Sequence, residues 1–212
     1  MNTSALGSAK RGRFITFEGI DGSGKSTQIA ALAAALKGAG HEVVLTREPG
    51  GTPLAEKLRA LILNDEMQVD TELLLFFAAR AQHVAEVIKP ALARGAWVIS
   101  DRFTDATYAY QVGGKGVDAS RCEAIEAWTL QGFRPDRTLL FDLPPAVAAA
   151  RRSARAGAVD RFEAETAQFF ARVRAAYLDR AAAEPARFLV LNAELSPEQL
   201  TERILGDFKA WW

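Results

Sequence analysis

The sequence predicts an α/β protein built as three layers, with a five-stranded parallel sheet between two layers of helices. Strand-like apolar runs alternate with helical stretches along the 212 residues, as in parallel sheets with crossover helices. Runs such as Trp97-Val98-Ile99 are continuously apolar, as expected for strands that are buried on both faces. The chain has no internal repeat and no interdomain linker. We therefore expect one domain over residues 13–212 after a flexible tail over residues 1–12.

The expected elements follow one another in a regular order. The first strand, Arg13–Glu18, holds an apolar run, and the Ala- and Leu-rich stretch that follows predicts a helix at Thr27–Lys37. Further short apolar runs predict strands at Val43–Thr46, Trp97–Ser100, Thr138–Leu143 and Phe188–Asn192. The longer patterns between them predict helices at Leu54–Leu63, Thr71–Arg94, Ser120–Leu130, Pro145–Arg155, Ala164–Ala183 and Pro197–Trp211. Residues 113–116, with three glycines, are expected to form a short flexible loop.

One motif lies between the first strand and the first helix. Residues 19–26 read Gly-Ile-Asp-Gly-Ser-Gly-Lys-Ser and fit the P-loop pattern G-x-x-x-x-G-K-[ST] without a mismatch. The glycines let backbone N–H groups approach an anion, and the helix that follows adds its positive dipole end. Lys25 suits the β- and γ-phosphates, and the Ser26 hydroxyl suits Mg²⁺. We expect a nucleoside triphosphate to be bound by Gly19, Ile20, Asp21, Gly22, Ser23, Gly24, Lys25, Ser26 and Thr27.

The composition argues against several other classes of protein. Lys and Arg together number 26, and Asp and Glu together also number 26. The chain therefore lacks the overall excess of basic residues that would indicate nucleic-acid binding. No apolar run is long enough to span a membrane, and residues 1–12 lack the apolar core of a signal peptide. The single cysteine, Cys122, cannot form an internal disulfide, which fits a reducing cytoplasm.

Polar residues follow the expected strands at the edge where open parallel sheets bind their ligands. Asp101 suits Mg²⁺ and Arg102 suits a phosphate, although a helix cap beside a surface arginine would give the same pattern. Arg47 precedes a sharp turn at residues 48–51 and is either a second phosphate clamp or part of a plain turn.

Two groups on helical stretches fit a nucleotide substrate, and each also has a plain structural explanation. Phe76 and Arg80 share a helix face, where a ring can stack on a base and a guanidinium can donate to its carbonyl. Because Arg has only donors, it favours O4 of thymine or uracil over the amino group of cytosine. The alternative is a core phenylalanine beside a solvated arginine. The basic segment at residues 151–157 is either a mobile lid that brings charge to a phosphoryl group or a solvated helix end.

These motifs occur together in one known family. The chain resembles bacterial thymidylate kinases, the nucleoside monophosphate kinases that phosphorylate dTMP, over about residues 14–170. The matching segments, in family order, are residues 17–27, 46–52, 76–80, 101–102, 109–111, 133–136 and 160–163. The P-loop alone indicates only nucleoside triphosphate binding. The T-R-E-P-G-G-T element, together with the Asp-Arg and Ala-Tyr-Gln elements, is far more specific.

The resemblance implies a P-loop NTPase fold with a short Arg-rich lid at about residues 150–162, the substrates ATP and dTMP, Mg²⁺, and a homodimer. By resemblance, Phe76 would stack on thymine, Arg80 would bind its O4, and either Thr107 or Tyr108 would make polar contacts to the base. Arg102 would hold the dTMP phosphate with Arg47 nearby, and Tyr110 would lie by the sugar and disfavour a 2′-hydroxyl. The magnesium and phosphate region would be managed by Asp21 and Asp101, and the lid arginines favoured for phosphate contact are Arg152 and Arg155.

The implied reaction needs no general base, because a phosphate monoester is mostly dianionic at pH 7. We assign no catalytic role to His41 or His83, and we expect His83 at the surface or against a partner. The terminal Trp211-Trp212 and the apolar faces of residues 54–63 and 71–94 fit a dimer interface and internal packing equally well.

Two rival functions remain open from the sequence. The first is a kinase for another acceptor, such as dUMP or a deoxynucleoside. In a deoxynucleoside kinase, Glu18 is a candidate for the base that removes the proton from the acceptor hydroxyl. A P-loop switch protein is the other, but the sequence has no Asn-Lys pair for a guanine-reading element.

Overall fold

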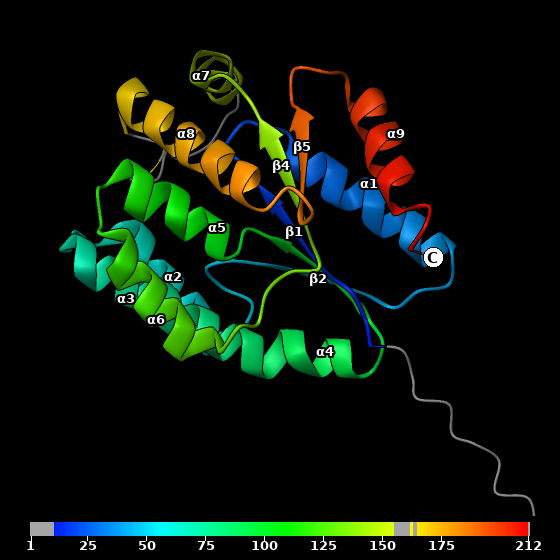
Figure 1. Cartoon of the computed structure of the whole chain (residues 1–212), viewed down its shortest axis with the longest axis horizontal. Helices are drawn as coiled ribbons and strands as arrows, with labels where there is room; N and C mark the ends of the chain where they lie inside the picture. Colours follow the sequence, from blue (N-terminus) through cyan, green and yellow to red (C-terminus); the bar gives the residue numbers. More distant parts are fainter. Residues whose placement is uncertain (1–10, 155–161, 163–164, 212) are drawn as a thin grey trace, which may run out of the picture.

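The computed structural model confirms the parallel α/β architecture and describes residues 11–154, 162 and 165–211 (Figure 1). Its five strands are β1 (Phe14–Glu18), β2 (Val43–Arg47), β3 (Trp97–Asp101), β4 (Arg137–Asp142) and β5 (Phe188–Asn192). They form one sheet in the order β2-β3-β1-β4-β5, and every neighbouring pair is parallel. Because β1 lies in the centre, the loop that follows it opens at the middle of the carboxyl edge of the sheet.

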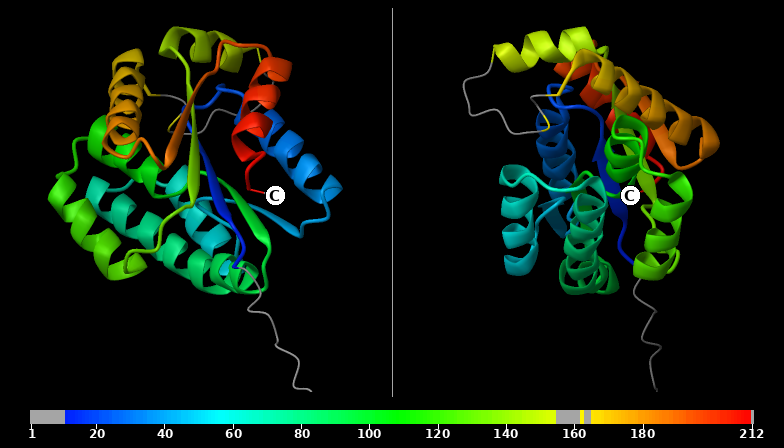
Figure 2. Two further views of the ribbon diagram at one scale, coloured as in Figure 1. Left: turned by 45° about the vertical axis from the view of Figure 1, so that its right-hand side comes forward. Right: turned by 90° about the vertical axis from the view of Figure 1, so that its left-hand side faces the viewer.

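Helices cover both faces of this sheet (Figures 1 and 2). On one side lie α1 (Lys25–Gly38) and α9 (Pro197–Phe208), and on the other lie α4 (Lys89–Ala93), α5 (Thr104–Thr107) and α8 (Ala167–Ala183). The remaining helical elements are α2 (Pro53–Asn64), α3 (Val69–His83), α6 (Ala119–Leu130), α7 (Pro145–Ser153) and the π-helical segments η1 (Val84–Ile88) and η2 (Tyr108–Gly114). The carboxyl end of β4 points toward α7 (Figure 1).

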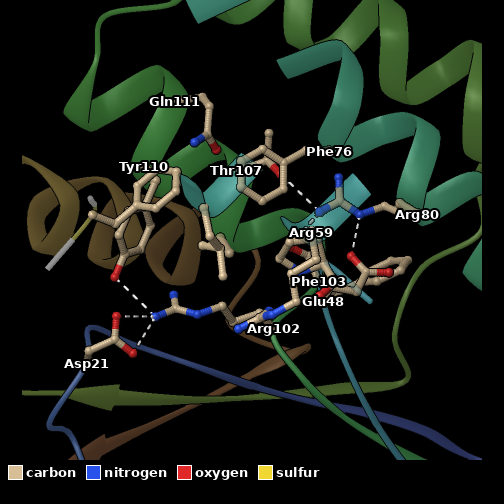
Figure 3. A pocket seen from close by; sticks show the side chains of 14 residues that line it. Asp21, Glu48, Arg59, Phe76, Arg80, Arg102, Phe103, Thr107, Tyr110 and Gln111 are labelled. Carbon is tan, nitrogen blue, oxygen red and sulfur yellow. Dashed lines mark hydrogen bonds and ion pairs between the residues drawn. The ribbon is translucent and has the colours of Figure 1, made fainter. Parts of the chain in front are cut away.

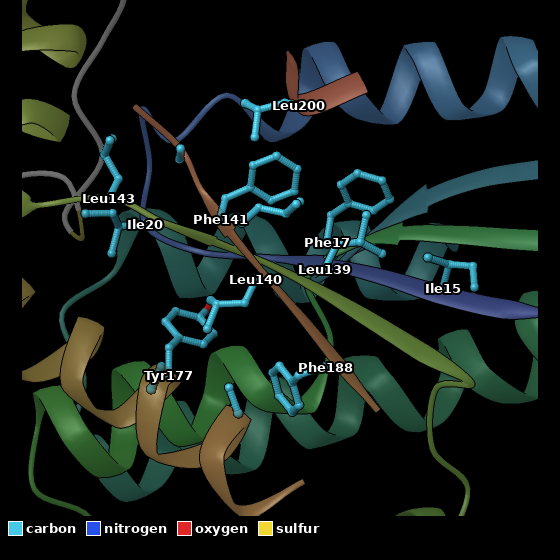
Figure 4. Close-up of a cluster of buried hydrophobic side chains, with 14 of the residues drawn as sticks. Ile15, Phe17, Ile20, Leu139, Leu140, Phe141, Leu143, Tyr177, Phe188 and Leu200 are labelled. Carbon is cyan, nitrogen blue, oxygen red and sulfur yellow. The ribbon is translucent and has the colours of Figure 1, made fainter. Parts of the chain in front are cut away.

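The core explains why the strand sequences are continuously apolar. Every residue of β1 is buried, because helices pack against both faces of the central strand. Figure 4 shows Phe17 and Phe141 on the side of α1, while Leu140 lies on the opposite side near Tyr177 of α8. The rings of Phe17 and Phe141 stack with their centroids 5.7 Å apart.

All five strands were predicted, but several helical boundaries differ from the prediction. The stretch expected as one helix at 71–94 is α3, η1 and α4 in direct succession. The helix expected to reach Trp211 ends at Phe208, and α7 ends at Ser153.

The expected loop at 113–116 is wrong for its first two residues, which belong to η2. This helical element and α5 were both missed, because Thr, Tyr and Gly are weak helix formers and packing against α8 overrides their propensity. Arg172 of α8 donates to the carbonyl oxygen of Gly114 from Nε at 3.2 Å and from Nη2 at 2.8 Å.

The expected tail joins the folded body two residues before the predicted boundary. Arg11 pairs with Asp136 at 2.8 Å, and the Gly12 amide donates to the carbonyl of Leu92 at 2.9 Å. The rest of the expected tail, residues 1–10, lies outside the described residues, and so does most of the expected lid, residues 155–161. Within the described part of the chain, no helix is long and apolar enough to cross a membrane.

Candidate active site

The Gly-rich loop leads from the end of β1 into α1. Gly24 is the N-cap of α1 with φ 92°, and no side chain in the described residues caps the helix. The first amides of α1 can therefore bind an anion. At Gly19, with φ 132°, a Cβ atom would lie 2.6 Å from the carbonyl oxygen of Phe141, so the loop accepts only glycine there.

Lys25 lies folded back over this loop. Its Nζ donates to the carbonyl oxygens of Gly19 at 3.0 Å and Ile20 at 3.4 Å, and the residue is only 6% exposed. Burial lowers the pKa of Lys25, and Arg102 adds to this effect. The side chain of Ile20 is in the core, so this residue offers only its backbone, whereas Ser26 and Thr27 are exposed at the start of α1.

Three buried polar side-chain atoms have no hydrogen-bond partner within the described part of the chain, and all three are in residues predicted for the site. They are Ser23 Oγ, Arg80 Nη1 and Asp101 Oδ1. A buried unpaired polar atom costs about 1–3 kcal/mol, so folded proteins avoid such atoms unless a ligand or water completes them. Their coincidence at the carboxyl edge of the sheet indicates a site that is built to bind something.

Arg102 is the central cation of the site (Figure 3). Its backbone is left-handed, with φ 72°, which is rare for a residue other than glycine. The Nη2 atom donates to both carboxylate oxygens of Asp21 at 3.0 Å and to the Tyr110 hydroxyl at 3.2 Å. Burial alone would raise the pKa of Asp21, but Arg102 and Lys25 outweigh it and lower the pKa to about 2. The Arg102–Asp21 pair thus joins the P-loop to the residue after β3.

Glu18 supports this arrangement from inside the protein. Its two carboxylate oxygens accept from the Phe103 amide at 2.7 Å and from the Tyr177 hydroxyl at 2.8 Å, and the residue has no exposed surface. Burial, and next the charge of Asp105, raise the pKa of Glu18 to about 8. A carboxyl group that is enclosed in this way cannot reach a substrate hydroxyl, so the geometry does not support Glu18 as a general base.

A pocket lies beside Arg102, between the P-loop, α2, α3 and η2 (Figure 3). Phe76 and Arg80 enter it from α3, Thr107 from α5, and Tyr110 from η2. Its full lining is Asp21, Glu48, Pro49, Arg59, Leu63, Phe76, Arg80, Arg102, Phe103, Ala106, Thr107, Tyr110, Gln111 and Phe162. An aromatic face and three arginines around one cavity are suited to a planar, anionic molecule such as a nucleotide.

The donor set fits Mg²⁺ that arrives with a phosphate ligand rather than a cage made by the protein. The described residues contain no group of three His, Cys, Asp or Glu that could hold a metal alone. Mg²⁺ is usually held by one or two carboxylates plus substrate phosphates and water. The unpaired Asp101 Oδ1 and the exposed Ser26 fit that pattern. The carboxylate of Asp21 is already paired with Arg102.

The thymidylate kinase family model matches residues 17–204, which is most of the chain. The chain belongs to this family. A thymidylate kinase of Thiobacillus denitrificans is 64% identical over 182 residues, covering 86% of this chain and 89% of the relative. One from Methylobacillus flagellatus is 55% identical over 203 residues, covering 94% of this chain and all of the relative. The crystal structure of thymidylate kinase from Ehrlichia chaffeensis superposes with a TM-score of 0.76 at 34% identity, covering 94% of this chain and 99% of that one.

Arg47 does not lie where the thymidylate kinase motif led us to expect it. It is 53% exposed, does not line the pocket, and pairs with Glu56 at 2.9 Å. Side chains alternate along a strand, and its neighbour Thr46 points to His83 on α3, so Arg47 points away from that face. A phosphate clamp at Arg47 is not supported by this geometry.

Tyr108 also lies apart from the pocket. Its hydroxyl donates to Glu126 at 2.5 Å, and the Arg180 guanidinium lies 4.0 Å from the centre of its ring. Successive side chains on a helical segment point about 100° apart, so Thr107 and Tyr108 cannot share one direction. Of the two alternatives for contact with a base, only Thr107 lines the pocket.

The described lid arginines already touch the P-loop. Arg152 donates to the Asp21 carbonyl at 3.0 Å and lies over the ring of Phe170 at 4.5 Å. Arg151 donates to the Gly22 carbonyl of the P-loop at 3.5 Å and to the Ala193 carbonyl at 2.9 Å. Arg155, the other predicted lid arginine, lies outside the described residues.

Sequence reasoning gave no role to three pocket residues, Arg59, Glu48 and Gln111. Arg59 donates to the Pro49 carbonyl at 2.9 Å, and Gln111 donates to Glu72 at 2.8 Å. Glu48 and Gln111 lie inside the segments that match the family, and this position was the only indication in the sequence that they belong to the site. Arg59 carried none, because a basic residue on a helix is most often at the surface.

Proposed function

We propose that this member of the thymidylate kinase family transfers the γ-phosphoryl group of ATP to the phosphate of dTMP, forming dTDP for dTTP synthesis. The observation that carries the proposal is the buried Arg80 Nη1, which has no partner among the described residues and belongs to a residue that lines the same pocket as Arg102. A donor without a partner suits O4 of thymine, while Arg102 suits the phosphate at the other end of the nucleotide.

On the donor side, ATP would be held by the loop amides and Lys25. Lys25 Nζ would exchange its two carbonyl contacts for phosphate oxygens, which are stronger acceptors. Asp101 and Ser26 would hold Mg²⁺, with Asp21 near the phosphates. When bound, the ion neutralises charge on the β- and γ-phosphates.

On the acceptor side, Arg102 would hold the dTMP phosphate. The nearby Arg59 replaces Arg47 as the second candidate for this contact. Phe76 would stack on thymine, and Thr107, whose hydroxyl accepts from Arg80 at 3.0 Å, would lie beside the base. Tyr110, whose hydroxyl accepts from Arg102, would lie by the sugar and disfavour a ribose 2′-hydroxyl.

The chemical problem is to bring two anions together. The acceptor phosphate is already mostly ionised at pH 7, so no residue has to remove a proton. Lys25, Arg102 and Arg152 would neutralise the approaching groups and stabilise the charge that spreads over the transferring phosphoryl group. Closure of the lid would exclude water and limit ATP hydrolysis.

The direct test is transfer of labelled phosphate from γ-³²P-ATP with dTMP or thymidine as acceptor. We expect label in dTDP and none in a product of thymidine. Label in dTMP after incubation with thymidine would instead assign the chain to the nucleoside kinases. The enclosed position of Glu18 supports the first outcome.

We also propose that the protein is a cytoplasmic homodimer. Leu54, Leu61 and Leu74 on α2 and α3 are about half exposed, and Trp128 on α6 is 81% exposed. Trp211 is partly buried, and its ring packs against Phe208 and Trp97, at 5.2 and 6.3 Å between ring centroids. Light scattering after gel filtration should give about twice the 23.0 kDa chain mass. A monomer at micromolar concentration would contradict the proposal.

A further inference from the structure

We propose that Glu48 and His83 fix the orientation of Arg80 and thereby set the choice of base. This inference rests on the proposed function, because it takes Arg80 as the group that reads position 4 of the pyrimidine. His83 does not line the pocket, and Glu48, which does, has its two carboxylate oxygens engaged by Arg80 and His83. Both are therefore positioning residues that act through Arg80.

A buried chain of hydrogen bonds runs from β2 to Arg80. His83 Nε2 lies 2.6 Å from the Thr46 hydroxyl, and His83 Nδ1 lies 2.9 Å from Glu48 Oε1. The other carboxylate oxygen of Glu48 accepts from Arg80 Nε at 2.6 Å. This corrects the expectation for His83, which lies inside the protein with no exposed surface rather than at a partner.

Within the described residues, every donor group of Arg80 except Nη1 has a hydrogen-bond partner. Nε donates to Glu48, and Nη2 donates to the Phe103 carbonyl at 3.1 Å and to the Thr107 hydroxyl at 3.0 Å. The guanidinium is planar and its donors form a rigid fork, so fixing two nitrogens also fixes the third. Nη1 is therefore held in one direction but has no hydrogen-bond partner among the described residues, and Arg80 lines the pocket.

Aromatic packing supports the same arrangement. The Arg80 guanidinium lies over the rings of Phe77 and Phe103, at 4.9 and 5.4 Å from their centroids. The turn that carries Glu48 closes directly on the His83 ring. At Gly51, with φ +86°, a Cβ atom would lie 2.6 Å from His83 Cδ2.

This geometry has a consequence for substrate choice. A fixed donor pairs with a carbonyl at position 4 but opposes an amino group there. Sites that must hydrogen-bond their substrate reject analogues that leave the buried group unpaired by as much as about 10⁴–10⁵-fold. If His83 and Glu48 no longer hold Arg80, its guanidinium can turn toward other acceptors, and this rejection weakens.

The sharpest pair of probes is dTMP and 5-methyl-dCMP, which differ in the group at position 4 and in the protonation of N3. The experiment measures kcat/KM for both in wild type, His83→Leu, His83→Asn and Glu48→Ala. Asparagine retains a donor near the place of Nδ1, whereas leucine retains only bulk. Asp207→Asn is the matched control, because it breaks the Arg137 ion pair, at 2.6 Å, away from the pocket.

We expect His83→Leu to lower the preference for dTMP over 5-methyl-dCMP, measured as the ratio of their kcat/KM values, by about 10–100-fold. The KM for dTMP should rise, and the KM for ATP should not change. His83→Asn should restore most of the ratio, and Asp207→Asn should not change it. Glu48→Ala, which removes the acceptor of Arg80 Nε, should narrow the ratio too, and it is the deciding variant if His83→Leu does not fold. An unchanged ratio in folded His83→Leu, or in folded Glu48→Ala, overturns the inference. Failure of wild type to phosphorylate dTMP would overturn the proposed function instead, so the two failures are distinguishable.

Discussion

The effect of Arg102 on protein stability can be separated from its effect on catalysis, because glycine suits its left-handed backbone conformation better than arginine does. An L-residue in this conformation costs about 1–2 kcal/mol, which glycine avoids, while glycine lowers stability by about 0.4–1 kcal/mol through the unfolded chain. Arg102 also forms a partly exposed ion pair with Asp21, worth about 1 kcal/mol or less. Its hydrogen bond to Tyr110 adds about 1 kcal/mol. Because the relief of backbone strain offsets most of these losses, we expect Arg102→Gly to change the free energy of unfolding by less than about 2 kcal/mol.

Activity should respond very differently. Arg102→Gly removes the cation proposed to hold the acceptor phosphate, and loss of one such contact costs on the order of 10²–10³ in rate. The control is Gln131→Gly, because Gln131 at the end of α6 is the other described non-glycine residue with positive φ, at 51°. Gln131→Gly should raise stability by about 0.5–1 kcal/mol and leave turnover unchanged.

Urea unfolding and coupled ADP release, measured on the same preparations, test both halves of this prediction. A stability loss above about 3 kcal/mol in Arg102→Gly would show that contacts of the Arg102 side chain stabilise the fold and compensate for the strained backbone. The strain would then need no explanation from ligand binding. Turnover within fivefold of wild type would refute the role of Arg102 in binding the acceptor phosphate.

Three further predictions follow from the site. Lys25→Ala should abolish turnover and leave dTMP affinity, measured by calorimetry, largely intact; equal loss of both would refute its role on the ATP side. Glu18→Gln should flatten the dependence of stability on pH. The folded protein keeps the Glu18 proton up to a pKa of about 8 while the unfolded chain loses it near 4.5, so wild-type stability falls as pH rises through this window. Urea unfolding at pH 5, 7 and 9 checks this, and parallel slopes in the two proteins would contradict it. Asp101→Asn should raise the Mg²⁺ concentration needed for half-maximal activity by at least tenfold, and an unchanged magnesium titration would count against Asp101 as a ligand.

The sequence was sufficient for the sheet and for the residues that enter the site from strand ends. Apolar runs on both sides of Gly19–Ser26 fixed the strand–loop–helix context, and the carboxyl edge of a parallel sheet brings Asp101 and Arg102 beside it. Helical spacing also placed Phe76 and Arg80 on one face, and both line the pocket.

The parts that sequence could not predict depend on contacts between distant segments. Arg47 and Tyr108 carry suitable chemistry, but the facing of a strand and the rotation of a helical segment direct them elsewhere. The burial of His83 depends on Glu48, which lies 35 residues earlier in the chain. The helicity of residues 104–114 depends on α8, and no local propensity indicated it.

In the proposed mechanism, a fixed arginine donor and an aromatic face select dTMP as the acceptor of a phosphoryl group from ATP. The most direct measurement is ADP release with ATP and Mg²⁺ against dTMP, dUMP, dCMP, UMP, AMP and thymidine. We expect dTMP to have the highest kcat/KM. We expect dUMP to follow within about 10–200-fold, because the two bases differ by one methyl group, and dCMP to be far lower. Equal rates with dTMP and dCMP, or a preference for thymidine, would contradict the assignment of Arg80 and the monophosphate acceptor.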